Sequence, residues 1–219
     1  MNIQNYHSIL SELPVQVTLI AVSKTKPVED IQLLYQEGQR VFGENRAQEL
    51  KSKYEVLPKD IEWHFIGHLQ TNKIKYIAPF VSLIHSVDSF NLLQEINTSA
   101  KKVNRIIPCL LQFYIAQEET KFGFDRQECI EMLESEMFKS LRNIEIVGVM
   151  GMATFTDDQE QIRNEFKSLH DHFNFLKTNY FQDNFKFKEI SMGMTDDYHI
   201  AIQEGSTMIR IGSAIFGSR

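Results

Sequence analysis

Short apolar runs alternate with longer amphipathic segments along the chain. The first run, Val17–Val22 (VTLIAV), is uncharged and rich in β-branched residues, which predicts a buried strand. The segment Pro27–Gly38 follows it, with proline at its start, acidic residues in its first turn and glycine at its end, which predicts a helix. This strand and helix together form the unit that the later sequence repeats.

The later elements keep the same order of strand and helix. Further strands are predicted at residues 40–43, 62–66, 83–87, 106–114, 144–151, 187–192 and 208–211. Further helices are predicted at residues 45–56, 70–77, 88–102, 125–139, 158–180 and 196–203. Asp88 is expected to cap the helix that begins there. About eight units in 219 residues gives roughly 27 residues per unit, close to the size of a βα repeat.

Alternating strands and helices predict a parallel sheet covered by helices. Eight units favour an α/β fold closed into a (β/α)8 TIM barrel, with residues 1–219 as a single domain. An open, doubly wound sheet is the alternative, but it needs a glycine-rich phosphate turn directly after the first strand. Here that strand ends in Ser23–Pro27 (SKTKP), without glycine. The sequence therefore favours the barrel.

Composition and charge narrow the class of protein. The chain has 23 Lys and Arg against 29 Asp and Glu, a net charge of −6, and no basic run, which argues against nucleic acid as a partner. No stretch approaches the roughly 18 to 20 apolar residues of a membrane helix. Residues 1–14 lack the basic and apolar regions of a signal peptide, and the two cysteines suit a reducing compartment. We therefore expect a cytoplasmic protein without a membrane partner.

Lys24 is the first candidate for chemistry, because the carboxyl ends of barrel strands face the active site. A lysine at the end of an apolar strand is costly unless it is paired or used. Burial and a neighbouring cation both favour the neutral amine, which is the nucleophile of a Schiff base. Lys26 is a candidate for that cation, since positions two apart share a strand face. The alternative is that both lysines are solvated loop residues.

A phosphate site is the second candidate. Ser191–Thr195 (SMGMT) and Arg210–Ser213 (RIGS) follow the last two predicted strands, where loops of this fold often bind phosphate. Gly212 would allow close approach of the backbone, and Thr195 and Ser213 would supply hydroxyl donors. Thr195 also precedes a predicted helix and could equally be its N-cap.

Barrel closure would relate these candidates to one another. It sets the eighth strand beside the first, which would bring Arg210 near Lys24. A lysine, an arginine and a phosphate cradle on one rim are a stronger indication of a binding site than any one of them.

Other reactive residues carry weaker signals. His64 and His68 are spaced like a metal-ligand pair, but the first lies in a predicted strand and the second in a loop, and no third ligand is evident. We expect no metal site. Cys109 lies within an apolar strand and is expected to be inert, and nothing around Cys129 suggests an activated thiolate.

Seven ordered blocks carry a family resemblance. They are LIAVSKTKP (Leu19–Pro27), FGENRAQE (Phe42–Glu49), EWHFIGHLQTNK (Glu62–Lys73), KFGF (Lys121–Phe124), VGVMGM (Val147–Met152), SMGMTDD (Ser191–Asp197) and STMIRIGSAIFG (Ser206–Gly217). In this order and spacing the sequence closely resembles the pyridoxal 5′-phosphate homeostasis protein family, from about residue 17 to its end.

The resemblance implies a single barrel similar to the N-terminal domain of alanine racemase, with pyridoxal 5′-phosphate (PLP) as cofactor. On the family pattern PLP is held as a Schiff base on Lys24 rather than Lys26. The other cofactor-binding positions are Asn45 near the ring, Arg210 facing the pyridine nitrogen, and Thr195, Gly212 and Ser213 at the phosphate. Many members carry serine in place of Thr195 and threonine in place of Ser213, and both exchanges keep a hydroxyl.

The same resemblance implies a non-enzymatic PLP-binding protein that controls the free level of the cofactor, with no catalytic residues. A charged Arg210 would keep the ring nitrogen unprotonated, which weakens PLP as an electron sink. Alanine racemase adds a second domain with an acid–base tyrosine, for which no residues remain here. We expect a monomer whose partners are PLP and PLP-dependent apo-enzymes. The alternatives are a slow PLP-dependent amino-acid racemase and a Schiff-base aldolase that needs no cofactor.

Overall fold

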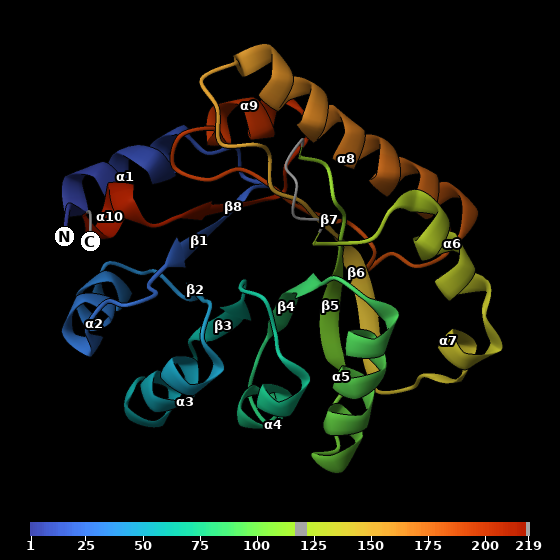
Figure 1. Ribbon diagram of the computed structural model, residues 1–219. Coiled ribbons are helices and arrows are strands. Elements are labelled where there is room, and N and C mark those ends of the chain that lie inside the picture. The colour runs from blue at the N-terminus through green and yellow to red at the C-terminus, as the bar shows by residue number, and fades with distance from the viewer. Residues whose placement is uncertain (117–121, 218–219) are drawn as a thin grey trace.

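The computed structural model describes residues 1–116 and 122–217. Within these ranges, eight parallel strands follow one another in sequence order around a closed barrel, and helices cover its outside (Figure 1). The strands are β1 (Thr18–Val22), β2 (Val41–Glu44), β3 (Glu62–Phe65), β4 (Leu83–Val87), β5 (Ile107–Gln112), β6 (Ile144–Met150), β7 (Glu189–Ser191) and β8 (Met208–Ile211). The predicted (β/α)8 barrel is confirmed, and the open sheet is excluded.

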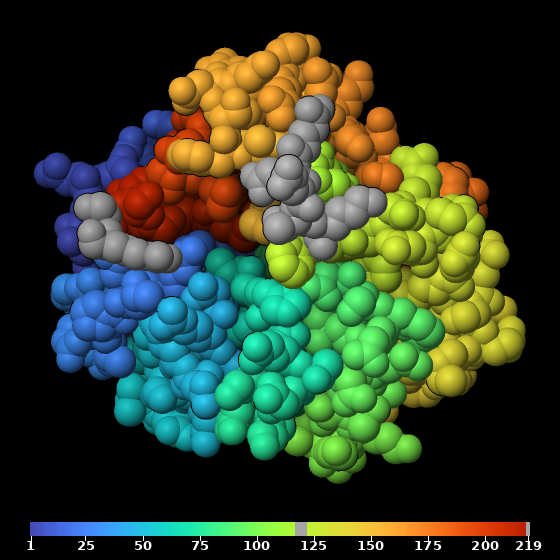
Figure 2. Space-filling view, in the orientation of Figure 1, coloured from blue at the N-terminus to red at the C-terminus, as the bar shows by residue number. Residues whose placement is uncertain are grey.

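The barrel closes between its first and last strands. β1 pairs in parallel with both β2 and β8, and in the second pairing Ile20 lies opposite Arg210. Figure 2 shows the result from outside, with the red C-terminal segments against the blue N-terminal ones. The closure thus carries Arg210 to the strand that leads into Lys24, as the sequence predicts.

Helices connect the strands and form the outer layer. They are α1 (Ile3–Glu12), α2 (Val28–Gln36), α3 (Ala47–Val56), α4 (Ile74–Ile77), α5 (Phe90–Lys102), α6 (Arg126–Glu134), α7 (Glu136–Ser140), α8 (Gln159–Asn179), α9 (Tyr198–Gln203) and α10 (Ser213–Phe216), with a 3-10 turn at Thr71–Lys73. None of the helices in the described ranges is long and apolar enough to cross a membrane.

Two predicted helix boundaries were wrong. Ser135 has an extended backbone and its hydroxyl accepts from the amide of Phe138, so it ends α6 and starts α7 within the single helix predicted at 125–139. Ser89 rather than Asp88 caps α5, because the Ser89 hydroxyl accepts from the amide of Leu92. Asp88 instead contacts His68, with its Oδ2 3.0 Å from His68 Nδ1, within hydrogen-bond distance. In both places a serine hydroxyl satisfies helix amides that would otherwise lack a partner.

The apolar core has two parts. Most buried residues lie between the strands and the helices, and Leu19 and Ala21 of β1 belong to this layer. A smaller cluster comes from five strands and contains no helix residue, so it fills the barrel interior: Ile20, Leu83, Leu110, Met150 and Met208. The alternation of Leu19, Ile20 and Ala21 between the two layers is the period of two expected of a strand.

The two end helices meet across the seam of the barrel. α1 buries Tyr6 and Ile9, and the amide of Asn2 donates to the carbonyl of Ile215 at 2.7 Å. The side-chain amide of Asn5 donates to the carbonyl of Ala214, also at 2.7 Å. These contacts hold α10 beside α1 (Figure 1) and so keep β8 in register at the edge of the functional site.

Candidate functional site

A cavity of about 510 Å³ lies at the carboxyl ends of the strands. Its lining includes every residue that the sequence proposes for cofactor binding: Lys24, Asn45, Thr195, Arg210, Gly212 and Ser213. These residues lie in or shortly after β1, β2, β7 and β8, so the barrel brings together positions that are far apart in the chain. This face is where TIM barrels carry their active sites.

Lys24 stands on a tight turn directly after β1. The amide of Ser23 donates to the carbonyl of Gly43, the amide of Lys26 donates to the carbonyl of Ser23, and Thr25 has a φ of 65°. Because β1 ends at Val22, Lys24 and Lys26 do not share a strand face, and that expectation was wrong. Both lysines are half-buried in the cavity wall, so they are not solvated loop residues either.

Lys26 is directed toward the last turn of the described chain. Its Nζ donates to the carbonyl of Phe216 at 3.1 Å and to that of Gly217 at 3.0 Å. These bonds fasten the β1–α2 turn to the end of α10 and hold that ammonium at the cavity rim.

Arg210 is buried at the base of the cavity, with only 4% of its surface exposed. Its Nη1 donates to Ser191 Oγ at 2.6 Å and its Nη2 donates to the carbonyl of Gly151 at 3.2 Å. Burial lowers the pKa of Arg210 to about 10, and the nearby Asp197 carboxylate opposes this shift. Arg210 therefore remains a cation at neutral pH and can only donate hydrogen bonds.

Two buried histidines extend this contact across the barrel interior. His85 Nδ1 lies 2.9 Å from Ser191 Oγ, and His85 Nε2 lies 3.0 Å from His64 Nδ1. Because Ser191 accepts from Arg210, its hydroxyl proton is free to point at His85, whose Nδ1 is then an acceptor and whose Nε2 carries the proton given to His64. Burial lowers the pKa of His64 to about 3 and that of His85 well below its ordinary value, so both rings are neutral at pH 7.

Sequence reasoning did not find this histidine chain. His85 lies in the middle of β4 and Ser191 at the end of β7, and their contact spans 106 residues. His64 was considered only together with His68, as a metal-ligand pair. Strand alternation alone could have indicated that His85 points into the barrel, but not which residues it meets there.

Asn45 lines the cavity and carries a buried acceptor without a partner among the described residues. This acceptor is its Oδ1. A Cβ at Gly67 would lie 2.6 Å from the Asn45 Cβ and carbonyl oxygen, so only glycine permits this close approach. A buried polar atom without a partner costs stability, which is a common feature of positions that meet a ligand.

Thr195 and Ser213 place two hydroxyls side by side. Ser213 Oγ donates to Thr195 Oγ1 at 3.3 Å, which joins the loops after β7 and β8. Thr195 is not the N-cap of α9, because that helix begins after Asp197, whose carboxylate instead accepts from the amide of Met194 at 2.5 Å. The capping alternative was therefore wrong, and both hydroxyls line the cavity.

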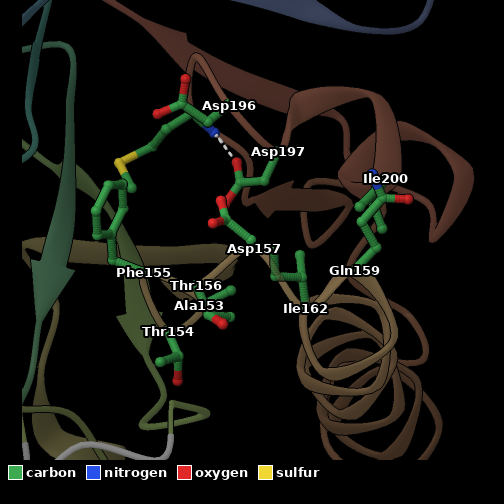
Figure 3. Close-up of a pocket in the computed structure, with 11 residues that line it drawn as sticks. Ala153, Thr154, Phe155, Thr156, Asp157, Gln159, Ile162, Asp196, Asp197 and Ile200 are labelled. Atoms are coloured by element: carbon green, nitrogen blue, oxygen red, sulfur yellow. Dashed lines mark hydrogen bonds between the residues drawn. The ribbon is translucent and has the colours of Figure 1, made fainter.

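A second cavity of about 410 Å³ adjoins the first and shares Phe155, Met194 and Asp196 with it. Figure 3 shows its lining, with Phe155 on one side and Ile162 and Ile200 on the other. Three carboxylates line it, those of Asp157, Asp196 and Asp197, and no lysine or arginine stands among its described lining residues. The first cavity, by contrast, has more cations than carboxylates: Lys24, Lys26 and Arg210 against Asp88 and Asp196. An anionic ligand therefore fits the first cavity and not the second.

The part of the chain that the structure describes gives little support for a metal site or a reactive cysteine. It contains no group of three or more His, Cys, Asp and Glu residues that could hold a metal ion. Cys109 and Cys129 are buried, and burial raises the pKa of Cys129 to about 12 and that of Cys109 further. Of the KFGF block, Lys121 lies outside the described residues, while Phe122 lines the larger cavity.

Comparison with known proteins identifies the family. The sequence model of the alanine racemase N-terminal domain matches residues 2–219. A pyridoxal phosphate homeostasis protein of Aquifex aeolicus is 41% identical over 202 residues, which cover 92% of this chain and 86% of that protein. One from Synechocystis sp. is 36% identical and covers 98% of this chain and 97% of its own length. The chain belongs to the pyridoxal phosphate homeostasis protein family.

Solved structures agree with this membership. PipY of Synechococcus elongatus, solved with PLP bound, has a TM-score of 0.88 and 32% identity, covering 99% of this chain and all (100%) of PipY. PipY without PLP has a TM-score of 0.91 and 34% identity. An alanine racemase of Clostridium difficile has a TM-score of 0.73 at 17% identity and is matched over 55% of its length, which shows the barrel alone. This member of the family therefore has the fold of the racemase's barrel.

Proposed function

We propose that this protein binds PLP in the larger cavity, linked to Lys24, and holds the cofactor for controlled release rather than for catalysis. The observation that carries the proposal is the gathering of Lys24, Arg210 and the paired hydroxyls of Thr195 and Ser213 in one cavity. The names of its relatives and the PLP bound to PipY support it.

The cavity suits the chemical groups of PLP. Its excess of cations favours a phosphate, and the hydroxyls of Thr195 and Ser213 are donors for phosphate oxygens. Gly212 lines the same cavity and has no side chain to keep that group away from its backbone. Asn45 lines the cavity, and its Oδ1 has no hydrogen-bond partner among the described residues, so this side chain has polar capacity left for a ring substituent. We therefore assign the phosphate to the loops after β7 and β8, and the ring to the side of Asn45.

PLP supplies an aldehyde that forms a reversible carbon–nitrogen bond with a primary amine, with loss of one water. Lys24 is the residue that offers this amine from the turn after β1, and Lys26 is engaged with the carbonyls of Phe216 and Gly217. Arg210 keeps its proton, so toward the ring nitrogen of bound PLP it would act only as a hydrogen-bond donor. A ring nitrogen that accepts a hydrogen bond remains unprotonated, and this favours holding the cofactor over carbanion chemistry.

Release follows from the reversibility of the same bond. Free amines, and the active-site lysines of PLP-dependent apo-enzymes, compete with Lys24 for the aldehyde. The cavity opens at the carboxyl face of the barrel, so a recipient can reach it there. We propose that the protein acts as a monomeric PLP carrier in the control of intracellular PLP.

One observation favours a second function, that of a slow amino-acid racemase. His68 lines the same cavity, with its Nδ1 3.0 Å from Asp88 Oδ2, and a histidine supported in this way can move a proton. Exchange of the α-proton of an amino acid in heavy water, lost in His68→Gln, would favour the racemase. Exchange no faster than that with free PLP would favour the carrier.

The proposal is tested by the visible absorption of protein incubated with PLP, followed by borohydride reduction and peptide mapping. We expect the reduced label on Lys24, loss of the label in Lys24→Ala, and its retention in the matched control Lys26→Ala. An unlabelled wild-type protein, or a label that persists in Lys24→Ala at another lysine with equal yield, would contradict the assignment.

A further inference from the structure

The turn that carries Lys24 rests on a buried group of charged side chains outside the cavity lining. Lys53 of α3 lies between Glu44, the last residue of β2, and Glu49, in the first turn of α3. Lys53 Nζ is 2.7 Å from Glu44 Oε1 and 2.7 Å from Glu49 Oε1. Both glutamates belong to the FGENRAQE block, in which only Asn45 has been given a role so far.

This group contacts both neighbours of Lys24 in the chain. Lys53 Nζ donates to the carbonyl of Ser23 at 2.8 Å, and the Ser23 hydroxyl donates to Glu44 Oε1 at 2.6 Å. The backbone amide of Thr25 donates to Glu49 Oε1 at 2.6 Å. The residues before and after Lys24 are therefore both tied to this group, Ser23 through Lys53 and Glu44 and Thr25 through Glu49.

Burial makes these contacts strong and specific. Side-chain exposure is 6% for Lys53, 0% for Glu44 and 23% for Glu49. Buried ion pairs contribute little net stability compared with apolar residues of similar size, because desolvation offsets their attraction. Glu44 Oε2 also has no hydrogen-bond partner among the described residues, and burial raises the pKa of this carboxyl. Stability alone is therefore a poor reason for placing these charges here.

The backbone that they hold is strained. Thr25 has a φ of 65°, in the left-handed region that β-branched residues seldom adopt. The hydrogen bond from the Thr25 amide to Glu49 compensates for the strain of this conformation. The conformation in turn sets the direction in which the Lys24 side chain leaves the turn.

We propose that Lys53, Glu44 and Glu49 are positioning residues that hold the Lys24 turn so that the Lys24 amine meets the aldehyde of PLP. This inference rests on the proposed function, in which Lys24 forms the link. A position error of about 1 Å can cost on the order of a hundredfold in the rate of such a step. Removal of the group should therefore weaken the link to Lys24 while the rest of the cavity still binds the cofactor.

A pair of ligands separates positioning from general support of the cavity. PLP binds through its phosphate, its ring and the link to Lys24, whereas pyridoxine 5′-phosphate has an alcohol in place of the aldehyde and cannot form the link. A positioning role predicts weaker linkage of PLP with unchanged affinity for pyridoxine 5′-phosphate. A purely structural role predicts that both fall together.

The first comparison uses Glu49, because it is partly exposed and its removal leaves no fully buried charge unpaired. Glu49→Ala removes the acceptor of the Thr25 amide, and we expect the rate of linkage to fall on the order of tenfold or more. Glu49→Gln keeps an acceptor oxygen and should restore much of the rate. Glu55→Ala removes an exposed carboxylate from the same helix, paired with Lys51 at 3.5 Å, and should match the wild type.

The second comparison is the double variant Lys53→Met with Glu44→Gln, which removes the buried charges together. It should link PLP to Lys24 more slowly than the wild type, with the affinity for pyridoxine 5′-phosphate unchanged. Thermal unfolding checks that each variant is folded, and if this one is not, the Glu49 variants decide the question.

The outcomes separate the two proposals. Wild-type linkage rates in both Glu49→Ala and the double variant, or a parallel loss of pyridoxine 5′-phosphate affinity, would overturn the positioning role and leave the carrier function intact. Failure of the wild-type protein to form the link at all would overturn the proposed function itself.

Discussion

Arg210 donates to Ser191 at 2.6 Å, and this contact sets the direction of the hydrogen bonds that run through the barrel interior. Since a guanidinium cannot accept, the Ser191 proton is free to point at His85, and in the tautomer that accepts it His85 donates from Nε2 to His64. Hydrogen bonds aligned head to tail strengthen one another in a buried environment. The site thus has a polar support that reaches from the cavity into the barrel.

Ser191→Ala should interrupt this support. The change leaves a buried Arg210 donor and the Nδ1 of His85 without their shared partner, which costs about 1 to 3 kcal/mol for each unsatisfied group. Urea unfolding followed by far-UV circular dichroism measures the loss. Ser11→Ala removes an exposed hydroxyl bonded to a carbonyl of the same helix and is the control. Equal stability of the two variants would show that the chain of hydrogen bonds is not needed.

The buried histidines predict a loss of stability in acid. His64 titrates at a pKa of about 3 in the folded protein, below the ordinary value of 6.5, and the pKa of His85 is lowered as well. Below pH 6.5 the unfolded chain takes up protons that the folded protein does not. The free energy of unfolding should therefore fall as the pH drops from about 6.5 toward 3, by about 1.4 kcal/mol per pH unit for each histidine.

Urea unfolding at several pH values between 7 and 4.5 tests this slope. His64→Gln should make the slope of the unfolding free energy against pH shallower by about the contribution of one histidine. His199→Gln removes an exposed imidazole and serves as the matched control. A His64→Gln slope identical to that of the wild type would mean that His64 already carries its charge in the folded protein.

Thr195 should act through its hydroxyl. Thr195→Val keeps the shape of the side chain and removes the donor, so we expect pyridoxine 5′-phosphate affinity to fall by about fivefold, corresponding to about 1 kcal/mol. Thr195→Ser keeps the hydroxyl and should bind like the wild type. Isothermal titration calorimetry measures both. A Thr195→Val variant with full affinity would remove Thr195 from the phosphate site.

The cysteines should be unreactive while the protein is folded. Both are buried, and burial raises their pKa values, so little thiolate is present at neutral pH. Ellman's reagent should modify both residues in concentrated urea and neither in buffer during a short incubation. Any slow modification in buffer should proceed at the rate of global unfolding. Rapid reaction of one thiol in buffer would indicate a local opening around α6 or β5.

The sequence was a good guide to the strands and to the residues that line the cavity, for identifiable reasons. Leu83–Val87 was predicted with the bounds that the structure has, because a short apolar run between polar segments has few other interpretations. The prediction that Lys24 and Arg210 lie near each other followed from the single assumption that eight strands close into a barrel. Barrel closure makes residues that are far apart in the chain neighbours in space. A correct prediction of the fold therefore also predicted which residues lie together in the cavity.

The features that the sequence could not show are those that depend on burial and on the direction of side chains. Glu49 and Lys53 are spaced like a surface ion pair on a helix, and only the packing of α3 beneath the Lys24 turn buries them. The helix α1 was not predicted, since its two buried residues, Tyr6 and Ile9, are too few for a clear amphipathic pattern. This helix is stabilised by its contacts with α10, a segment that is distant in the sequence.

The seam between β1 and β8 also has a consequence for biosynthesis. Lys24 leaves the ribosome well before Arg210, with most of the barrel translated between them. The cavity that contains both residues cannot exist on a chain that stops before β8, because β8 is the strand that closes the barrel. A nascent chain should therefore capture no cofactor from the cell, and the capacity to hold it should arise in one step when the barrel closes.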